Sequence, residues 1–500
     1  MTALKQNAAP RPTASAGWAP RLAQEARLQQ LESLLAPRRS DGDAVDTEIE
    51  RAVLLGALDR RQEAQAAFIA ILQRLPTHFS ALNEFGTLLT SMGAIDAACR
   101  VYSEAIIHHP DNPMGHVNLA NLLLRANKHD QARAHYEAAL KADPDHAPAH
   151  QGLGAVLADI GDRDGAQAHF RKGFRGHAVS TLPYRGTKPP IVLLQLVSSG
   201  GGNIPTASFL DDCIFLTSVV VTDHLDPWVP LPPHQLIFNA IGDADLCEPA
   251  LRAAINLIAR SSAPVINDPR AVMKTGRIDN ANRLAAVPGV VTPRTISIPR
   301  HVLAGPDGAR AIADHQFSFP LLLRSPGYHT GRNFIIVDDA TALSAAAAGL
   351  PGDDLLVIQY LDARGADGSA RKYRVMMIGG KIYPLHLAIS RDWKVHYFTS
   401  DMADKPDHRT EEAKFLADMP AVLGAKAHHA LEGIRDALGL DYAGIDFGLS
   451  GDGDLLLFEA NATMVIAVPD NDERWAYRRK AITGIIGAVV AMLRQKAASN

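Results

Sequence analysis

The chain has few cysteines and no pattern that would pair them. Cys99, Cys213 and Cys247 are its three cysteines among 500 residues, and they are far apart. Their spacing excludes a disulfide framework and suits a reducing compartment, so we expect each thiol to be a small buried side chain. The twenty histidines are scattered and show no paired metal-ligand spacing.

An excess of one charge sign and long apolar runs are also missing. Fifty basic and 54 acidic residues leave a formal net charge of −4. The chain therefore lacks the excess of positive charge that indicates binding to nucleic acid or to an anionic membrane. Residues 1–40 lack the apolar segment of a secretory signal. The apolar run from Gly484 to Leu493 is about half the length needed to span a bilayer. We therefore expect a cytoplasmic protein that binds neither nucleic acid nor membrane.

The length of the chain requires more than one domain, because 500 residues exceed what one core usually holds. The apolar fraction of 47% and the charged fraction of 21% are those of globular domains. We expect a disordered or partly helical tail over residues 1–43, all-α helical repeats over 44–176, and a linker rich in proline and glycine over 177–190. An α/β region follows from residue 191.

A 34-residue period is the strongest organisational signal. Four columns of residues repeat at this step and in register: Pro76, Pro110 and Pro144; Ala64, Ala98, Ala132 and Ala166; Phe68, Tyr102, Tyr136 and Phe170; Ala52, Gly86, Ala120 and Gly154. Pairs of helices explain these residue types. The prolines follow the second helix, the small residues let paired helices approach, and the aromatic residues fill the space between successive pairs. One pair cannot bury its apolar face alone, so several must stack.

These columns resemble the tetratricopeptide repeat, with about four units between Ala44 and Gly176. The tryptophan that usually stands near the start of each unit is absent. The resemblance implies a concave surface that holds a peptide or protein partner. A spacer or dimerisation arm is the alternative.

The region after the linker alternates between strand and helix patterns. The expected strands are Ile191–Val197, Cys213–Val221, Leu236–Asn239, Pro264–Asn267 and Thr295–Ile298, and the expected helices are Glu248–Arg260 and Asp279–Ala286. This alternation predicts a mostly parallel sheet with helices on its faces. The glycine-rich turn Ser198–Asn203 after the first strand is either a tight connection or a contact to substrate.

The segment from Asp441 to Met464, DYAGIDFGLSGDGDLLLFEANATM, is the most informative. Asp452-Gly453 between apolar runs predicts a two-residue hairpin turn, which would pair Gly451 with Asp454 and Asp446 with Glu459. One face of the hairpin is apolar and therefore expected to be buried; it comprises Ile445, Phe447, Leu449, Leu456, Phe458 and Ala460. The other face comprises Asp446, Gly448, Glu459 and Asn461.

The Cβ atoms of Asp446 and Glu459 would lie about 5 Å apart across this hairpin. In a cleft, their repulsion costs about 3–4 kcal/mol, and a divalent cation between them removes that cost. The oxygen donors of Asp446, Glu459 and Asn461 suit magnesium bridged to phosphates. On a solvated face, water would reduce the repulsion to about 1 kcal/mol. The neighbouring Ala460 and Ala462 favour the cleft.

At this hairpin the chain resembles the ATP-grasp superfamily. The motif of that superfamily is an Asp on one strand and Glu-x-Asn at the end of the next, matched here by Asp446 and Glu459-Ala460-Asn461. The resemblance implies an α/β pre-ATP-grasp domain over residues 191–300 and an α+β ATP-grasp domain over 301–500. It implies ATP and Mg²⁺ as cofactors, with Asp446, Glu459 and Asn461 as metal ligands.

The resemblance also implies roles for basic and loop residues. Arg324, Arg374 and Arg277 would contact ATP phosphates, with Arg324 and Arg374 as catalytic residues, although lysine usually stands at the positions of Arg277 and Arg324. A loop would close over the phosphates, and a strand end would receive adenine. The implied loop contacts are Gly327, Tyr328, His329, Thr330 and Gly331, and the implied adenine contacts are Gln359, Tyr360 and Leu361.

The activity implied by the resemblance joins a small-molecule or peptide carboxylate to an amine. The carboxylate attacks the γ-phosphate of ATP, and a nitrogen nucleophile captures the acyl phosphate. The segment His386–Tyr397 is a candidate for the acceptor side, with Arg391, Lys394 and His396 as a carboxylate clamp or base, or else a polar loop around Trp393. Two alternatives remain: a kinase on the same scaffold, and a non-catalytic nucleotide-binding interaction scaffold.

Overall fold

The computed structural model describes residues 21–35, 44–327, 331–395, 397, 400–469 and 471–499. The chain divides into two compact units. Unit 1 comprises Met1–Gly201 and Leu210–Phe238, and unit 2 comprises Gly202–Phe209 and Asn239–Asn500. A helical-repeat region is followed by a mixed α/β region, which confirms this part of the predicted fold class.

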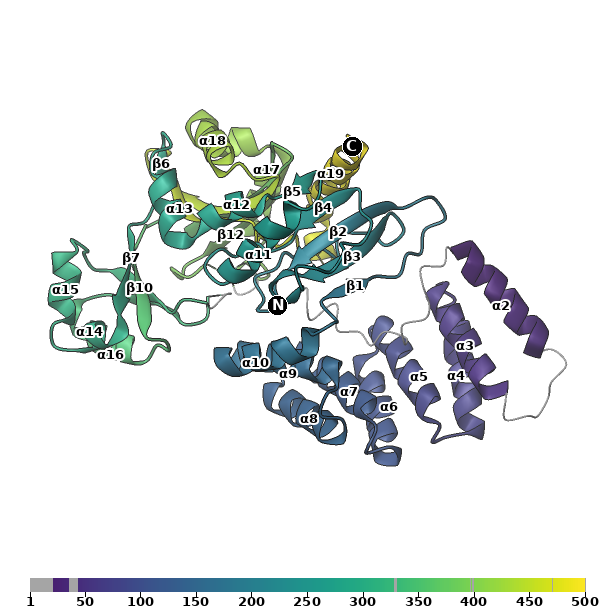
Figure 1. Cartoon of the computed structure of the whole chain (residues 1–500). Coiled ribbons are helices and arrows are strands. Elements are labelled where there is room, and N and C mark those ends of the chain that lie inside the picture. Colours follow the sequence, from purple (N-terminus) through teal and green to yellow (C-terminus); the bar gives the residue numbers. More distant parts are fainter. Residues whose placement is uncertain are drawn as a thin grey trace. The chain divides into compact units, whose positions relative to one another are not determined.

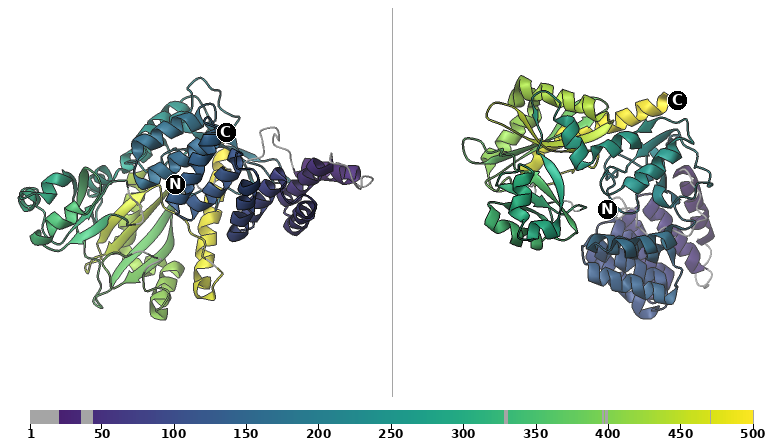
Figure 2. Two further views of the ribbon diagram at one scale, coloured as in Figure 1. Left: turned by 90° about the horizontal axis from the view of Figure 1, so that it is seen from below. Right: turned by 60° about the vertical axis from the view of Figure 1, so that its left-hand side comes forward.

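The described part of unit 1 begins with α2 (Arg21–Leu35), which is followed by helical hairpins. They are α3 (Ala44–Ala57) with α4 (Arg61–Arg74), α5 (Phe79–Ser91) with α6 (Ile95–His108), α7 (Pro113–Arg125) with α8 (His129–Ala142), and α9 (Ala147–Ile160) with α10 (Arg163–Phe174). The hairpins follow one another as antiparallel helix pairs (Figures 1 and 2). Each of α4, α6 and α8 ends two residues before a proline of the periodic column, since proline cannot continue a helix.

The periodic columns form the inner packing of the hairpins. Their alanine and aromatic members are at most 3% exposed. Gly86 on α5 lies directly against Tyr102 on α6, where a Cβ atom would stand 2.5 Å from the ring. The aromatic column therefore packs against the small column of its own hairpin, and not only between hairpins as expected. Contact between hairpins also occurs, since Phe68 stacks on Phe85 with ring centroids 5.7 Å apart.

A mixed five-stranded sheet of order β1-β3-β2-β4-β5 follows the repeats, and its last strand is β5 (Val265–Ile266). β2 (Ile191–Val197) runs parallel to β3 (Phe215–Val221), β1 (Val179–Thr181) pairs antiparallel with β3, and β4 (Leu236–Asn239) lies on the other side of β2. β1 lies within residues 177–190, which the sequence predicts to be a linker. A three-residue edge strand is too short to show a period-2 pattern, and its partner β3 lies far along the chain.

Unit 2 contains a four-stranded antiparallel sheet of order β7-β10-β8-β9. Its strands are β7 (Thr295–Pro299), β10 (Asp354–Gln359), β8 (Leu321–Arg324) and β9 (Phe334–Val337). The helices α14 (Arg300–Ala304), α15 (Gly308–Asp314) and α16 (Ala340–Ala348) contribute to the core on one face. Strand alternation turns Leu322 and Arg324 to the opposite face, which carries a smaller apolar cluster.

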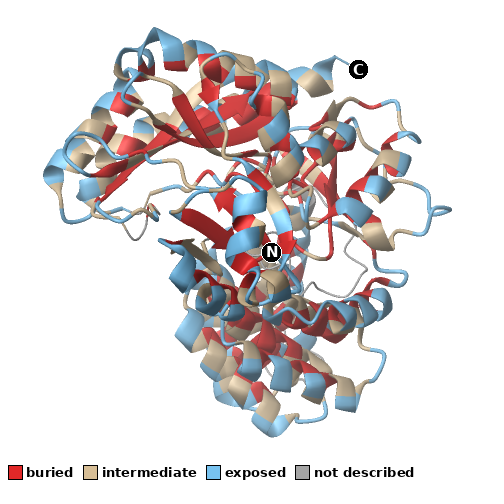
Figure 3. Cartoon of the chain, turned by 90° about the vertical axis from the view of Figure 1, so that its left-hand side faces the viewer, coloured by how far each residue is buried: buried red, intermediate tan, exposed pale blue. Residues whose placement is uncertain are grey.

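The second sheet of unit 2 has five strands in the order β12-β11-β13-β14-β6. Its strands are β12 (Lys381–Ser390), β11 (Ala370–Ile378), β13 (Tyr442–Leu449), β14 (Leu455–Asn461) and β6 (Val290–Val291). In Figure 3 the strands are mostly buried, whereas many helical residues are exposed. The sheet is antiparallel except where β6 meets β14. The mostly parallel arrangement predicted from alternation therefore does not extend to these strands.

Strand pairing crosses residue 300, where the sequence predicts a domain boundary. β6 and β7 precede it, yet they pair with β14 and β10, which follow it. These pairings join distant parts of the chain, so no local change in composition marks them. The helices α11 (Glu248–Ile258), α12 (Pro269–Val272) and α13 (Arg277–Leu284) also belong to unit 2.

The C-terminal helices pack against the five-stranded sheet. They are α17 (Pro406–Ala417), α18 (Met419–Leu438) and α19 (Ala476–Ala498). Among the described residues, the segment Glu473–Ala498 is the one helix long and apolar enough, by length and composition, to cross a membrane. Five of its apolar side chains are buried in unit 2, where α19 contacts β11 and β12: Ile482, Ile485, Val489, Met492 and Leu493.

Candidate functional site

The hairpin formed by β13 and β14 pairs Asp446 with Glu459, as the sequence predicts. The turn differs from the prediction. Leu449 pairs directly with Leu455, and the N–H of Ser450 donates to the carbonyl of Asp454 at 2.9 Å. The loop is therefore longer than two residues, and the predicted pair of Gly451 with Asp454 does not form.

A β-bulge restores the predicted register before the acidic residues. Phe447 pairs with Leu457, whereas Asp446 pairs with Glu459, so β14 has one extra residue, Phe458, between these pairs. An extra residue inverts the alternation of side chains beyond it. Leu456 therefore lies on the acidic face, Phe458 is half-buried in the bulge, and their predicted place on the apolar face is wrong.

Asp446 is only 4% exposed and is held by two cations of β11. Arg374, its register partner, donates from Nε to Oδ1 and, at 2.7 Å, from Nη2 to Oδ2. The Nζ of Lys372 lies 3.2 Å from Oδ2. Burial by itself would raise the pKa of Asp446, but Arg374 and Lys372 outweigh it and hold that pKa well below its usual range. Asp446 is therefore ionised, with both oxygens already paired.

Glu459 is half-buried and pairs with Arg277, whose Nη2 lies 2.8 Å from Oε1. Helix α13 is held beside β14 because Asn280 donates from Nδ2 to the carbonyl of Ala460 at 2.6 Å. Burial acts to raise the pKa of Glu459, but the charges of Arg277 and Arg324 prevail and lower it. The predicted phosphate ligand Arg277 and the predicted metal ligand Glu459 are thus neighbours.

Arg324, at the end of β8, faces the same group of charges. Its guanidinium lies over the ring of Phe334, 5.5 Å from the centroid. Burial and the nearby Arg277 lower the pKa of Arg324 to about 10, although Glu459, Asp243 and Asp245 act in the opposite direction. The structure therefore brings Arg277, Arg324 and Arg374 together around Asp446 and Glu459.

The structure places Asn461 opposite Gly444 at the end of β14. Its side-chain oxygen Oδ1 accepts hydrogen bonds from the backbone N–H of Thr463 at 3.0 Å and from Oγ1 of Thr463 at 2.9 Å. In this arrangement the Asn461 side chain closes the turn that follows the strand. A role as a metal ligand requires this oxygen to exchange at least one of these partners.

The predicted phosphate loop connects β8 to β9. Gly327 and Gly331 lie at its ends with φ of +79° and +70°, a conformation that favours glycine. Tyr328, His329 and Thr330 lie outside the described residues. The Nζ of Lys394 donates to the carbonyl oxygens of Gly331 and, at 3.0 Å, of Phe334. Lys394, a candidate for the acceptor side, is thus bonded to the backbone after this loop.

The structure describes two of the other acceptor-side residues, Arg391 and Trp393. Arg391 is exposed, Trp393 packs edge-on against Phe334 with centroids 5.4 Å apart, and His396 lies outside the described residues. His386 is 6% exposed on β12, opposite Arg374, and its Nδ1 has no hydrogen-bond partner. Burial and the charge of Arg374 hold the pKa of His386 well below its usual range.

The strand predicted to receive adenine ends earlier than expected, because β10 stops at Gln359. The backbone N–H of Gln359 donates to the carbonyl of Arg294 at 2.9 Å. Tyr360 and Leu361 follow the strand and are half-buried. Tyr360 belongs to the apolar cluster beside Arg324, whose other members are Leu322, Leu356, Ile358, Ile278, Phe334, Ile336 and Trp393.

Three charged residues of this site were missed. Lys372 was overlooked although it stands two residues before Arg374, a spacing that places both on one face of a strand. The acidic pair is Asp243 and Asp245, after β4; Asp245 accepts a hydrogen bond from the backbone N–H of Arg277 at 3.0 Å. Nothing near Asp245 in the sequence signals this contact, because Arg277 lies 32 residues away.

The helical hairpins of unit 1 are a second candidate functional region. Residues 89–155 and 123–174 match the tetratricopeptide repeat family. The predicted repeats are confirmed by this match and by the packing of the helical hairpins. Repeats of this family indicate a protein or peptide partner.

Several solved structures are similar to the tetratricopeptide repeats of this chain. A crystal structure of MamA is 18% identical and covers 31% of this chain and 88% of its own, with a TM-score of 0.27. MamA from Desulfovibrio magneticus RS-1 is 20% identical, with coverages of 35% and 93% and a TM-score of 0.27. A tetratricopeptide repeat protein from Parabacteroides merdae ATCC 43184 is 14% identical, with coverages of 31% and 60% and a TM-score of 0.28. No curated protein matches the chain.

The tetratricopeptide repeats also bring together histidines that are distant in the sequence. His116 on α7 meets His135 on α8, and His150 on α9 meets His169 on α10. The sequence shows no paired metal-ligand spacing among the histidines, yet the fold pairs these four. A spacing of 19 residues is not one of the short metal-ligand spacings, and only the antiparallel helices bring these side chains into contact.

Proposed function

We propose that unit 2 is an ATP- and magnesium-dependent ligase of the ATP-grasp type, which joins a carboxylate to an amine through an acyl phosphate. The tetratricopeptide repeats bind a peptide or protein partner. The observation that carries the proposal is the pairing of Asp446 and Glu459 on neighbouring strands, each held by an arginine from another element. Such a group of carboxylates and guanidinium ions suits a metal–polyphosphate ligand.

The four-stranded sheet supports a nucleotide as that ligand. On β8, Leu322 and Arg324 alternate onto one face, so an apolar surface adjoins the guanidinium of Arg324. Tyr360 and Trp393 are partly buried in the apolar cluster, and aromatic side chains of this kind stack with flat rings. An adenine ring and its phosphates need these two kinds of surface next to each other.

The donor atoms fit magnesium, which prefers oxygen ligands. In the structure, Arg374, Lys372 and Arg277 neutralise Asp446 and Glu459. When ATP binds, these arginine and lysine side chains would form ion pairs with the phosphates in place of the carboxylates. The carboxylates would then hold the metal together with Asn461. Magnesium would there neutralise and clamp the phosphate oxygens.

The protein's contribution to the reaction is positioning and charge neutralisation. Arg324 and Arg374 would offset the negative charge that spreads over the transferring oxygens. The loop between Gly327 and Gly331 would exclude water, which otherwise hydrolyses an acyl phosphate. The bond from Lys394 to Gly331 would hold one end of that loop.

A non-catalytic nucleotide-binding scaffold is the second candidate. One observation favours it: both oxygens of Asp446 and the side-chain oxygen of Asn461 already have protein partners. In this case the charges would stabilise unit 2, and the repeats would be the functional surface.

The deciding experiment measures ADP release from Mg²⁺ and ATP with a panel of carboxylates and amines, with products identified by mass spectrometry. The wild type should release ADP only when both substrates are present. Glu459→Gln should abolish release, and Asp454→Asn, a surface change in the same hairpin, should preserve it. ATP binding without turnover on any substrate pair would support the scaffold. ADP release without an amine, with a phosphoester product, would indicate a kinase. No ATP binding at all would refute the proposal.

A further inference from the structure

The tetratricopeptide repeats contain two histidine pairs of the same geometry. The Nδ1 atoms of His116 and His135 are 3.0 Å apart, and those of His150 and His169 are 2.8 Å apart. The ring centroids are 5.3 Å and 5.0 Å apart, with interplanar angles of 38° and 45°. One pair lies 34 residues after the other, so each repeats the same contact in successive hairpins.

A backbone carbonyl orients the first histidine of each pair. The Nε2 of His116 lies 3.3 Å from the carbonyl oxygen of Pro110, and the Nε2 of His150 lies 3.0 Å from that of Pro144. A carbonyl oxygen only accepts, so Nε2 carries the proton and Nδ1 presents a lone pair to the other histidine. Metal-binding histidines are commonly oriented by the same bond from their second nitrogen.

The hydrogen bonds place the protons of each pair. In the short Nδ1–Nδ1 contact the second histidine donates from Nδ1 to the lone pair of the first. The proton of the second Nδ1 must therefore leave that atom before a metal ion can bind there. His116, His135 and His169 are half-buried, so solvent reaches at least one member of each pair.

The repeat fold does not require histidine at these positions. One period before His116 and His135 stand Leu82 and Val101, in the hairpin formed by α5 and α6. The same two places therefore accept an apolar pair in one hairpin and histidine pairs in the next two. Apolar residues are therefore sufficient for packing at these two places, and packing alone does not explain the histidines.

We propose that each histidine pair is a binding site for a divalent transition-metal ion such as zinc, with two Nδ1 atoms as ligands and water completing the coordination. Imidazole suits zinc, nickel and copper, whereas magnesium prefers oxygen. With zinc–nitrogen bonds of about 2.0–2.1 Å, a tetrahedral ion separates its ligand nitrogens by about 3.3 Å. Each pair thus opens by about 0.3–0.5 Å when the ion enters. The second histidine moves its proton from Nδ1 to Nε2, so no proton is released.

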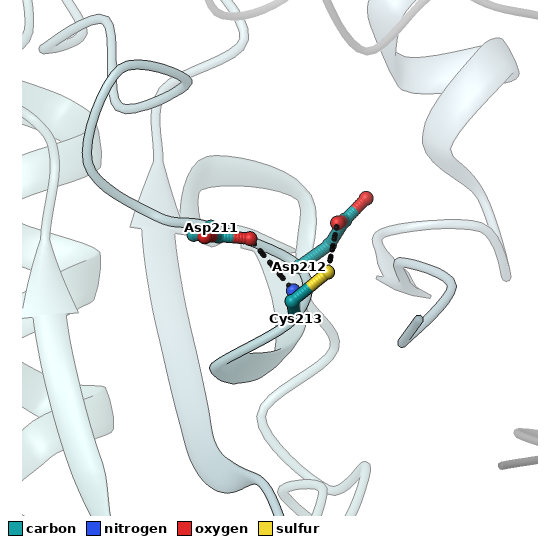
Figure 4. A group of neighbouring side chains, drawn as sticks. All are labelled: Asp211, Asp212 and Cys213. Carbon is teal, nitrogen blue, oxygen red and sulfur yellow. Dashed lines mark hydrogen bonds between the residues drawn. The ribbon is translucent and has the colours of Figure 1, made fainter. Parts of the chain in front are cut away.

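A competing group of ligand atoms must be separated from these pairs. Asp211, Asp212 and Cys213 lie together near the start of β3 (Figure 4), with their ligand atoms within 4.8 Å of one another. Local bonds explain this group: Asp211 accepts from the backbone N–H of Cys213 at 2.8 Å, and Asp212 pairs with Arg185 at 2.9 Å. Cys213→Ser is therefore the matched control.

The test is calorimetric titration of the untagged full-length protein with Zn²⁺. The wild type should bind two ions with similar affinity. His135→Gln and His169→Gln should each weaken one site by at least about tenfold, and the double variant should lose both. The glutamine amide can still donate a hydrogen bond to the first histidine. Without metal, in EDTA, the variants should therefore have the same midpoint of thermal denaturation as the wild type. Cys213→Ser should bind as the wild type does.

Two results would overturn the inference: zinc binding that the double glutamine variant retains at full affinity, or a wild type that binds no zinc at these sites. Loss of binding only with Cys213→Ser would move the site to that cluster. If a glutamine variant misfolds, His116→Leu with His135→Val copies the pair of the preceding hairpin. That variant should keep the helical circular dichroism spectrum and lose one ion.

Discussion

Replacing Asp446 with asparagine tests whether this carboxylate is the centre of a buried charge network. The change preserves the shape of the side chain and removes its charge. Arg374 and Lys372, whose side chains are 21% and 15% exposed, would lose their anionic partner. They would then face the charges of Arg277 and Arg324 without it.

The expected cost follows from this geometry. Removing one partner of a buried ion pair costs about 3–5 kcal/mol. Because some water reaches both cations, we expect the free energy of unfolding of unit 2 to fall by about 2–4 kcal/mol. The pKa of Asp446 is lowered in the folded state, so its contribution is fully present above the unfolded value of about 3.9. It is lost as pH falls through the lower folded value. The difference in the free energy of unfolding between the wild type and Asp446→Asn should therefore be largest at neutral pH and should decrease in strong acid.

Urea denaturation followed by circular dichroism measures the cost, and hydrogen exchange in β13 shows that the loss is in unit 2. Asp454→Asn is the matched control, because Asp454 pairs with Lys426 at 2.8 Å on the surface, where such pairs contribute about 0–1 kcal/mol. Equal effects of the two variants would refute the reasoning, as would a difference that does not depend on pH.

Two further changes test the packing of the repeats and of the loop. Gly86→Ala should gain about 1 kcal/mol of helix propensity but lose about 1–3 kcal/mol by overpacking against Tyr102, so thermal denaturation of the repeats should show a lower or unchanged midpoint. A higher midpoint would contradict this packing. Lys394→Met removes the ammonium that bonds to Gly331 and Phe334. Loss of a charged hydrogen bond worth about 1.5 kcal/mol should speed hydrogen exchange after the loop by about tenfold, and unchanged exchange would show that this bond does not hold the loop.

Several elements could be predicted because their signals are local. The tetratricopeptide repeats follow from columns of residues 34 apart, such as Ala98 and Ala132, since each column stands at one place in successive hairpins. The pairing of Asp446 with Glu459 follows from alternation and a turn signal. The bulge at Phe458 was not predicted. The loop shifts the strand register by one residue from the predicted one, and the bulge shifts it back, so Asp446 still pairs with Glu459.

Other features depend on contacts that no local pattern records. β1 and β6 are strands of three and two residues, so neither is long enough to show a period. Lys372 and Asp245 belong to the charge group only because the sheet and α13 place them there. Cys213 was expected to be buried, yet it is exposed.

By itself, the sequence determined the helical period, the alternation along the hairpin and the chemical types of the candidate ligands. These properties depend on residues that are neighbours along the chain. Only the tertiary structure decided that Arg277 reaches Glu459, 182 residues away, and that His150 faces His169. Electrostatic and hydrogen-bond energies depend on distance through space, and packing sets that distance.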